Sequence, residues 1–196
     1  MVGRQFVALV IRVRFSMPAP LKKEYKMKII FLDIDGVLNT LMVDTEPFSS
    51  SRGQILRDKF YYKLNMPNDL EVSNRQAVMW LNKLCIETNA KIVITSTWRM
   101  GVDGLENTKK ALYNSGLIKD VEIIDATPIL QEPKDMNIRG HEIQMWLDKH
   151  QNIDNYVILD DDVDMLENQL NHLVQVNTYY GFGFPDYEKA IKIFEG

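Results

Sequence analysis

Three short apolar runs, far apart in the sequence, each end in side chains that carry oxygen atoms. Ile29 to Leu32 precede Asp33 and Asp35, Ile92 to Ile94 precede Thr95 and Ser96, and Tyr156 to Leu159 precede Asp160 and Asp161. Such continuous runs of β-branched and aromatic residues are typical of strands that are buried on both faces of a parallel sheet. Because ligands bind beyond the carboxyl ends of such strands, we expect these oxygen atoms to converge on one site.

The apolar pattern elsewhere predicts helices that alternate with these strands. Residues 73–76 form a capping box before a helix whose apolar residues 77, 80, 81, 84 and 88 share one face. Further helices are predicted at 107–114, 140–150 and 164–173, and further strands at 121–124 and 173–176. We therefore predict an α/β fold: a single Rossmann-like domain with a mostly parallel sheet and helices on both faces.

A basic segment precedes the predicted domain. Residues 1–28 carry seven basic residues and one acidic residue, a net charge of +6, so the remainder must carry −10 to give the total of −4. We interpret residues 1–26 as a non-catalytic extension and residues 27–196 as the folded domain. A transit-like presequence, a partner-binding arm, and residues ahead of a natural start at Met27 are the alternatives for the extension. The acidic remainder argues against broad nucleic-acid binding, which usually needs a basic face.

The spacing Asp33-Ile34-Asp35-Gly36 places two carboxylates at the tip of the first strand. Gly36 supplies the turn by which the chain leaves the strand. One carboxylate can attack phosphorus, and a second carboxyl can protonate the leaving oxygen. The same spacing also occurs in ordinary loops and in calcium-type sites, so this segment alone leaves both interpretations open.

The acidic cluster at 160–164 has a simpler interpretation, in which Asp162 or Asp164 caps the next helix. A cap does not explain why three separate apolar strands all end in oxygen ligands. A magnesium site does, since Mg²⁺ takes carboxylate oxygens together with substrate phosphate oxygens.

Four motifs, taken in order, resemble those of the haloacid dehalogenase (HAD) superfamily of aspartate-nucleophile phosphatases. Leu32 to Leu38 resemble the first motif, Thr95 the second, Arg139 the third, and Leu159 to Asp161 the fourth. The resemblance covers roughly residues 27 to 193. The segments at 96–99 and 159–162 are also similar in sequence to HAD domains of RNA-repair proteins.

The resemblance implies roles for individual residues. It implies that Asp33 is the nucleophile, that Asp35 is the acid and base, and that Mg²⁺ is the cofactor. The implied metal ligands are Asp33, the Asp35 carbonyl and Asp161, with Asp160 as a neighbouring candidate. The implied phosphate-binding residues are Thr95, Ser96 and Arg139, and Lys134 competes with Arg139 for the basic position.

Family members that act on small metabolites carry a cap domain, and the present chain has little room for one. Residues 40–72, which are largely polar, are all that separates Asn39 from the predicted helix at 73. The resemblance is therefore to capless members, whose open sites accept macromolecular phosphoesters.

We predict a magnesium-dependent phosphomonoester hydrolase that forms an aspartyl-phosphate and acts on a phosphoprotein, phosphotyrosine included. A nucleic-acid end-processing (3′-) phosphatase is the alternative, and a catalytically idle binding module is a third hypothesis. Trp98, Tyr179 and Tyr180 are expected to pack rather than to stack on a substrate.

The single cysteine, Cys85, excludes an internal disulfide framework and suits a reducing compartment, so we expect a cytoplasmic protein. It is expected to fill the core. No stretch is long enough to span a bilayer, while the N-terminal segment leaves targeting open and the sequence leaves the oligomeric state open.

Overall fold

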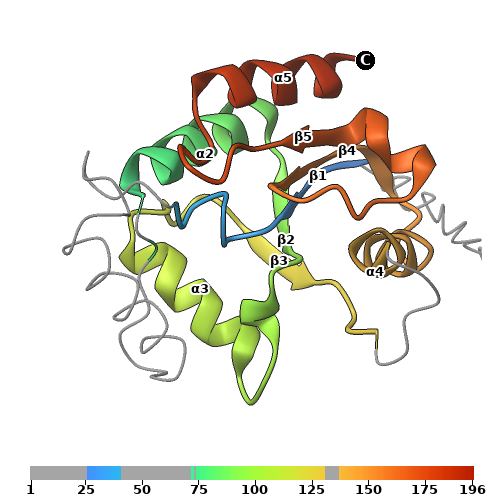
Figure 1. Ribbon diagram of the computed structural model, residues 1–196, viewed down its shortest axis with the longest axis horizontal. Helices are drawn as coiled ribbons and strands as arrows, with labels where there is room; N and C mark the ends of the chain where they lie inside the picture. Colours follow the sequence, from blue (N-terminus) through green and yellow to red (C-terminus); the bar gives the residue numbers. More distant parts are fainter. Residues whose placement is uncertain (1–25, 41–71, 73, 131–136) are drawn as a thin grey trace, which may run out of the picture.

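The computed structural model describes residues 26–40, 72, 74–130 and 137–196. Their strands form one parallel sheet of five strands in the order β3-β2-β1-β4-β5 (Figure 1). The strands are β1 (Met27–Leu32), β2 (Lys91–Ile94), β3 (Ile123–Ala126), β4 (Ile153–Asp160) and β5 (Leu173–Gln175). The sequence predicted a mostly parallel sheet, and every strand pair in it is parallel.

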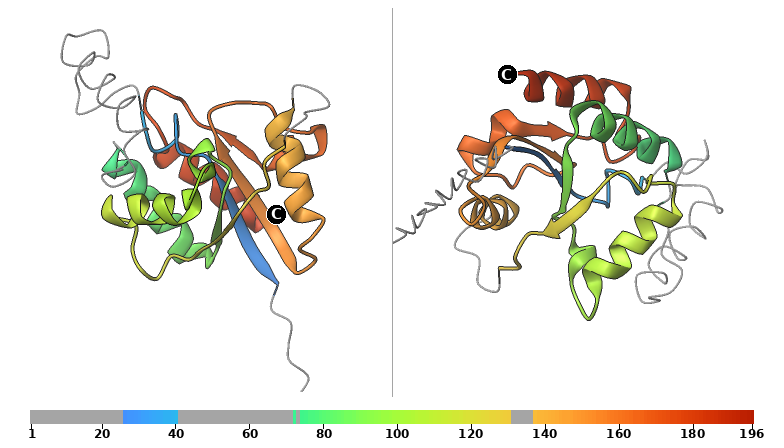
Figure 2. Two further views of the ribbon diagram at one scale, coloured as in Figure 1. Left: turned by 90° about the horizontal axis from the view of Figure 1, so that it is seen from below. Right: turned by 180° about the vertical axis from the view of Figure 1, so that it is seen from behind.

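Helices cover both faces of this sheet, and Figure 2 shows α4 on the side away from α2 and α5. The helices are α2 (Arg75–Thr88), α3 (Gly104–Asn114), α4 (Ile138–Leu147) and α5 (Phe184–Glu195), with 3₁₀ turns η1 (Thr97–Arg99) and η2 (Glu167–His172). Alternate residues of β1 face opposite ways, as the two-residue period of a strand requires. Ile30 and Leu32 belong to the larger buried cluster, which includes residues of α2 and α5. Phe31 faces the smaller cluster, which includes Trp146 of α4. The predicted Rossmann-like α/β fold is confirmed.

The strand register aligns the residues that follow the strands. Leu32 lies opposite both Ile94 and Leu159. The pairing continues for one more residue, because the Asp33 N–H donates to the Leu159 carbonyl and the Thr95 N–H donates to the Leu32 carbonyl, each at 2.9 Å. Asp33, Thr95 and Asp160 therefore lie side by side at the carboxyl edge of the sheet, next to the point where the strand order reverses.

Several element boundaries differ from the sequence prediction. Helix α2 is capped by Asn74, whose side chain accepts a hydrogen bond from the Ala77 N–H at 3.0 Å, whereas residue 73, where the predicted capping box begins, lies outside the described residues. Helix α3 starts three residues earlier than predicted, after Asp103 in the left-handed conformation. Strand β3 lies two residues later, and the helix predicted at 164–173 is the shorter 3₁₀ turn η2. The sequence analysis gave no prediction for α5.

Asp164 does act as a cap, although for a different helix than expected. Its Oδ2 accepts a hydrogen bond from the Arg139 N–H at 3.2 Å, and its carbonyl accepts one from the Gly140 N–H at 3.0 Å. Both donors belong to the first turn of α4, where N–H groups have no partner within the helix. The acidic cluster thus anchors the end of α4 that carries Arg139.

Some expectations fall on residues that the structure does not describe. These are residues 1–25 of the extension predicted at 1–26, the absence of a cap domain within 41–71, and the competing basic residue Lys134. Cys85 is 3% exposed, as a core-filling residue should be, and burial raises its pKa to about 12. Among the described helices, none has the length and apolar character needed to cross a membrane.

Candidate active site

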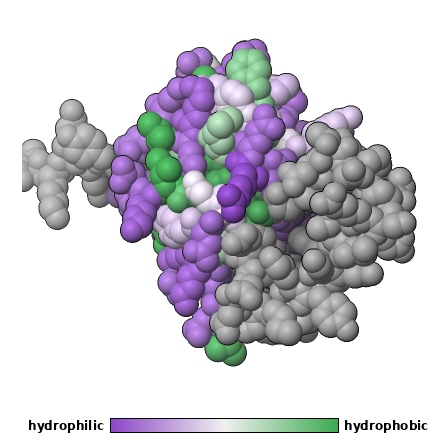
Figure 3. Space-filling model, turned by 90° about the vertical axis from the view of Figure 1, so that its left-hand side faces the viewer, coloured by the Kyte–Doolittle hydropathy of each residue, from purple (hydrophilic) through white to green (hydrophobic). Residues whose placement is uncertain are grey.

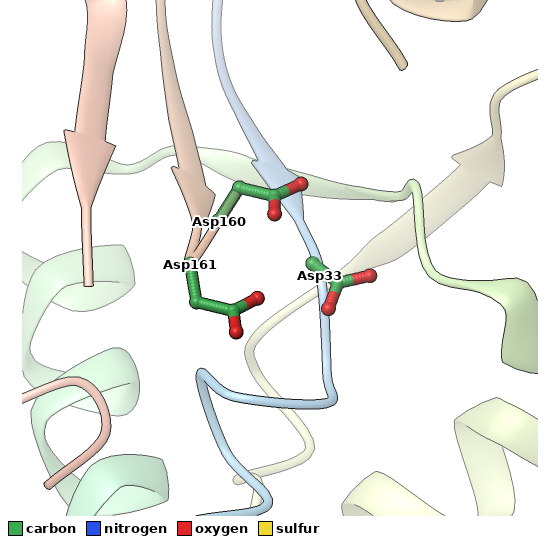
Figure 4. A group of neighbouring side chains, drawn as sticks. All are labelled: Asp33, Asp160 and Asp161. Carbon is green, nitrogen blue, oxygen red and sulfur yellow. The ribbon is translucent and has the colours of Figure 1, made fainter. Parts of the chain in front are cut away.

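Three carboxylates meet at the carboxyl edge of the sheet. Asp33 follows β1, whereas Asp160 ends β4 and Asp161 follows it, and Figure 4 shows the side chains of Asp160 and Asp161 directed to the side where Asp33 lies. One oxygen of each carboxylate lies within 4.8 Å of the others. Asp33 and Asp160 are buried, so the three groups cannot all be charged there without a positive partner.

Asp161 is held in place by two features of neighbouring segments. Thr178 Oγ1 donates a hydrogen bond to Asp161 Oδ2 at 2.8 Å. On the other side lies Gly36, whose φ is +81° and at which a Cβ atom would come within 2.2 Å of Asp161 Cγ. The turn after β1 therefore needs glycine both for its backbone angle and for the space that Asp161 occupies.

Arg139 supplies positive charge from the first turn of α4. Its Nη2 lies 3.3 Å from Asp33 Oδ1, and its Nε lies 3.3 Å from Asp160 Oδ2. The second contact is an ion pair without hydrogen-bond geometry, because neither atom has a hydrogen-bond partner. One guanidinium thus bridges the carboxylates at the ends of β1 and β4 and retains an unused donor.

Hydroxyl groups line the part of the edge that follows β2 and β3. Thr95, Ser96 and Thr127 are almost fully buried, and none of their side-chain oxygens has a hydrogen-bond partner. Buried hydroxyls are normally paired, so unpaired ones suit a ligand that accepts hydrogen bonds. Thr127 lies in register with Thr95, and its backbone N–H donates to the Ile94 carbonyl at 2.9 Å. The sequence analysis missed Thr127 because β3 was placed two residues too early.

The second carboxylate of the first motif, Asp35, is held by two side chains. Asn39 Nδ2 donates to Asp35 Oδ1 at 2.9 Å, and Trp98 Nε1 donates to Asp35 Oδ2 at 3.0 Å. Trp98 also packs against the larger cluster, as expected, but its contact with Asp35 was not foreseen. Packing is the wrong expectation for Tyr179 and Tyr180, which are 50% and 69% exposed.

A family comparison decides the classification. The model of the family described as "HAD domain in Swiss Army Knife RNA repair proteins" matches residues 29–186. The chain belongs to the HAD superfamily. No curated protein and no solved structure matches it. HAD domains are generally hydrolases, phosphatases among them.

All the HAD motif residues that the structure describes lie at this edge of the sheet. Asp33, Asp35, Thr95, Ser96, Arg139, Asp160 and Asp161 are the sequence-predicted site residues that it brings there. Their predicted roles as nucleophile, acid, phosphate ligands and metal ligands stay predictions. On the side of the molecule that Figure 3 shows, the described residues present a mostly hydrophilic surface.

The HAD site shifts the pKa values of its carboxyl groups upward. Burial raises the pKa of Asp33 well above its ordinary value, the charge of Asp160 raises it further, and Arg139 opposes both. Burial also raises the pKa of Asp160 to about 6, again against the influence of Arg139. Burial raises the pKa of Asp35, while hydrogen bonds from Asn39 and Trp98 lower it. A single arginine therefore does not compensate the carboxylates, and a further cation would favour their charged forms.

The residues present fit Mg²⁺, which HAD domains typically use. The donor set consists of carboxylate oxygens, which this cation prefers, and Asp160 Oδ2 is buried without a hydrogen-bond partner. Both carboxylate oxygens of Asp160 nevertheless already contact groups of the protein. Its Oδ1 accepts a hydrogen bond from the Asp162 N–H at 3.0 Å, and its Oδ2 lies 3.3 Å from Arg139 Nε. Among the described residues, only Thr178 donates a hydrogen bond to the Asp161 carboxylate, at Oδ2. Asp161 is therefore the better candidate ligand.

We expect Asp161→Asn to raise the Mg²⁺ concentration needed for half-maximal activity more than Asp160→Asn does. The amide is a weaker ligand, and high Mg²⁺ should recover part of the activity of Asp161→Asn. Magnesium titrations of the two variants measure this difference. A larger shift for Asp160→Asn would reverse the ligand assignment.

A buried ion pair behind the site was not foreseen from the sequence. Arg99 and Glu142 are less than 8% exposed, and Arg99 Nη2 lies 2.5 Å from Glu142 Oε2. Arg99 also donates to the carbonyls of Thr95, Ser96, Thr127 and Pro128. Glu142 in turn lies 3.7 Å from Arg139 Nη1. The pair joins the ends of β2 and β3 to the helix that carries Arg139.

Arg99→Met is expected to lower the free energy of unfolding by about 3 to 5 kcal/mol, since it leaves Glu142 buried without its closest partner. Chemical denaturation measures the change. The matched control is Lys91→Met, which breaks the more exposed pair with Glu122 at 2.7 Å and should cost less than about 1 kcal/mol. Equal losses in the two variants would contradict a structural role for the buried pair.

Proposed function

We propose that the protein is a magnesium-dependent phosphomonoester hydrolase in which Asp33 is the nucleophile. The observation that carries this proposal is the meeting of the Asp33 carboxylate, the Arg139 guanidinium at 3.3 Å and the unpaired Thr95 hydroxyl at one edge of the sheet. A nucleophile, a cation and a neutral donor are the groups that phosphoryl transfer requires.

Asp33 and Asp35 carry out the bond-making and proton-transfer steps, and the other site residues bind the phosphate. Asp33 attacks phosphorus, and the bond to the leaving oxygen breaks as Asp35 gives that oxygen a proton. Asp35 then takes a proton from the water that hydrolyses the aspartyl-phosphate and releases phosphate. Thr95 and Arg139 bind the non-bridging oxygens, with Ser96 beside them. Bound Mg²⁺ would neutralise the repulsion between a carboxylate and a dianionic phosphate.

For the substrate, we propose a phosphorylated nucleic-acid end. The sequence analysis favoured a phosphoprotein, but the family description names RNA-repair proteins and so supports the nucleic-acid alternative. Tyr179 and Tyr180 add support, because exposed aromatic rings can stack on bases. They are the two residues that follow Thr178 in the sequence, and Thr178 holds Asp161. The net charge of −10 on residues 29–196 remains an argument for a phosphoprotein substrate.

A substrate panel tests both parts of the proposal. The protein is incubated with Mg²⁺, or with a chelator, and with 3′- or 5′-phosphorylated oligoribonucleotides, phosphotyrosine peptides and sugar phosphates. We expect magnesium-dependent phosphate release, with the highest kcat/KM on one of the oligonucleotides. A phosphopeptide as the best substrate would overturn the proposed substrate and leave the hydrolase intact. No release from any ester would favour the idle binding module.

A further inference from the structure

Trp98 has a contact that packing alone does not require. Its indole N–H donates to Oδ2 of Asp35 at 3.0 Å, while Asn39 donates to Oδ1 at 2.9 Å. Each oxygen of the carboxyl group is thus held by a side-chain N–H from a different segment, one four residues and one 63 residues later in the sequence. Two such contacts restrict rotation of the carboxyl group about its final bond.

The backbone of Trp98 is itself firmly anchored. Its carbonyl accepts a hydrogen bond at 3.0 Å from the hydroxyl of Thr108, a fully buried residue of α3. The next residue, Arg99, is the buried arginine that donates to the carbonyls of Thr95 and Ser96. Trp98 therefore projects from a short turn that is fixed to both α3 and the end of β2. A side chain held in this way can orient its partner closely.

We propose that Trp98 is a positioning residue for Asp35 and that its N–H holds the carboxyl group where its proton reaches the leaving oxygen. This inference rests on the proposed function, because it requires Asp35 to act as the general acid. In that step the proton passes from Asp35 to the leaving oxygen while the bond from Asp33 to phosphorus forms. The bond from phosphorus to the leaving oxygen breaks, and the indole N–H keeps its own proton.

The alternative is that the carboxylate merely satisfies a half-buried indole N–H. The two explanations differ in how activity depends on the leaving group. p-Nitrophenolate departs easily without a proton, whereas an alkoxide needs one, so general acid catalysis matters most for alkyl esters. Loss of positioning should therefore harm alkyl esters selectively, whereas loss of a structural contact should harm all esters alike.

Trp98→Phe keeps a packed aromatic ring and removes the N–H. Its kcat and KM are measured with Mg²⁺ on p-nitrophenyl phosphate, phenyl phosphate and propyl phosphate, beside those of the wild type. We expect kcat/KM on propyl phosphate to fall by about tenfold or more and kcat/KM on p-nitrophenyl phosphate by less than about threefold. The ratio kcat/KM covers the steps up to release of the alcohol, so it excludes the hydrolysis of the aspartyl-phosphate, in which Asp35 acts alike for all three esters.

The matched control is Trp80→Phe, since the Trp80 ring packs on Phe184 and Tyr187 of α5. It should leave the dependence on the leaving group unchanged. Equal losses of kcat/KM on the three esters in Trp98→Phe, or no loss on any, would overturn the inference while the hydrolase stands. A wild type that hydrolyses none of the esters would overturn the proposed function and this inference with it. If Trp98→Phe does not fold, benzothienylalanine at position 98 removes the N–H and retains the ring shape.

Discussion

Asp33→Asn is expected to reduce turnover of p-nitrophenyl phosphate by roughly 10⁴-fold or more. An amide is a poor nucleophile, and the change also removes one of the three carboxylates at the edge of the sheet. Mass spectrometry of acid-quenched samples provides a second measurement. The wild type should carry a phosphoryl group on the protein, and Asp33→Asn should not.

The matched control for this change is Asp103→Asn. Asp103 is an exposed residue before α3 with a φ of 56°, a conformation that asparagine also tolerates. Its activity should equal that of the wild type. A folded Asp33→Asn protein with near-normal turnover would show that another group attacks phosphorus.

Gly36→Ala is expected to remove most of the activity through a different cause. The added Cβ would lie 2.2 Å from both Cγ and Oδ2 of Asp161, so the Asp161 carboxylate has to move. The left-handed backbone adds a strain of roughly 1 to 3 kcal/mol. We expect a lower melting temperature and a sharply raised Mg²⁺ requirement, measured by thermal unfolding and by magnesium titration of activity.

Gly101→Ala separates the two causes in that prediction. Gly101 has a φ of +88°, close to the +81° of Gly36, but nothing lies within 4 Å of a Cβ atom there. It should therefore lose a similar amount of stability and keep its Mg²⁺ requirement. If both variants retain activity, displacement of Asp161 is unimportant for the reaction.

The parallel sheet and the site residues at its edge were predictable because short segments of the sequence indicate which strands are buried and where each strand ends. A run such as Ile29 to Leu32 has to be buried, and the residue after it then lies at the carboxyl edge whatever surrounds it. This is why Asp33, Thr95 and Asp160 were expected to converge, as their register shows.

The partners behind the site depend on tertiary contacts that no local pattern encodes. Arg99 and Glu142 are 43 residues apart in the sequence. Because charged residues are mostly exposed, the sequence predicts a surface position for each of them. Trp98 was assigned to packing because tryptophan is large and apolar, and only the fold brings its N–H to Asp35.

The turn after β5 contacts both the end of β4 and the loop after β1. Thr178 holds Asp161, and the Phe182 N–H donates to the Val37 carbonyl at 2.9 Å. The loop that carries Asp35 and Gly36 is therefore completed by residues synthesised about 140 positions later. A ribosome-bound chain that lacks residues 178–182 can form β1 and β2 but cannot brace this loop or Asp161. We expect the site to remain inactive during translation until that turn has left the exit tunnel.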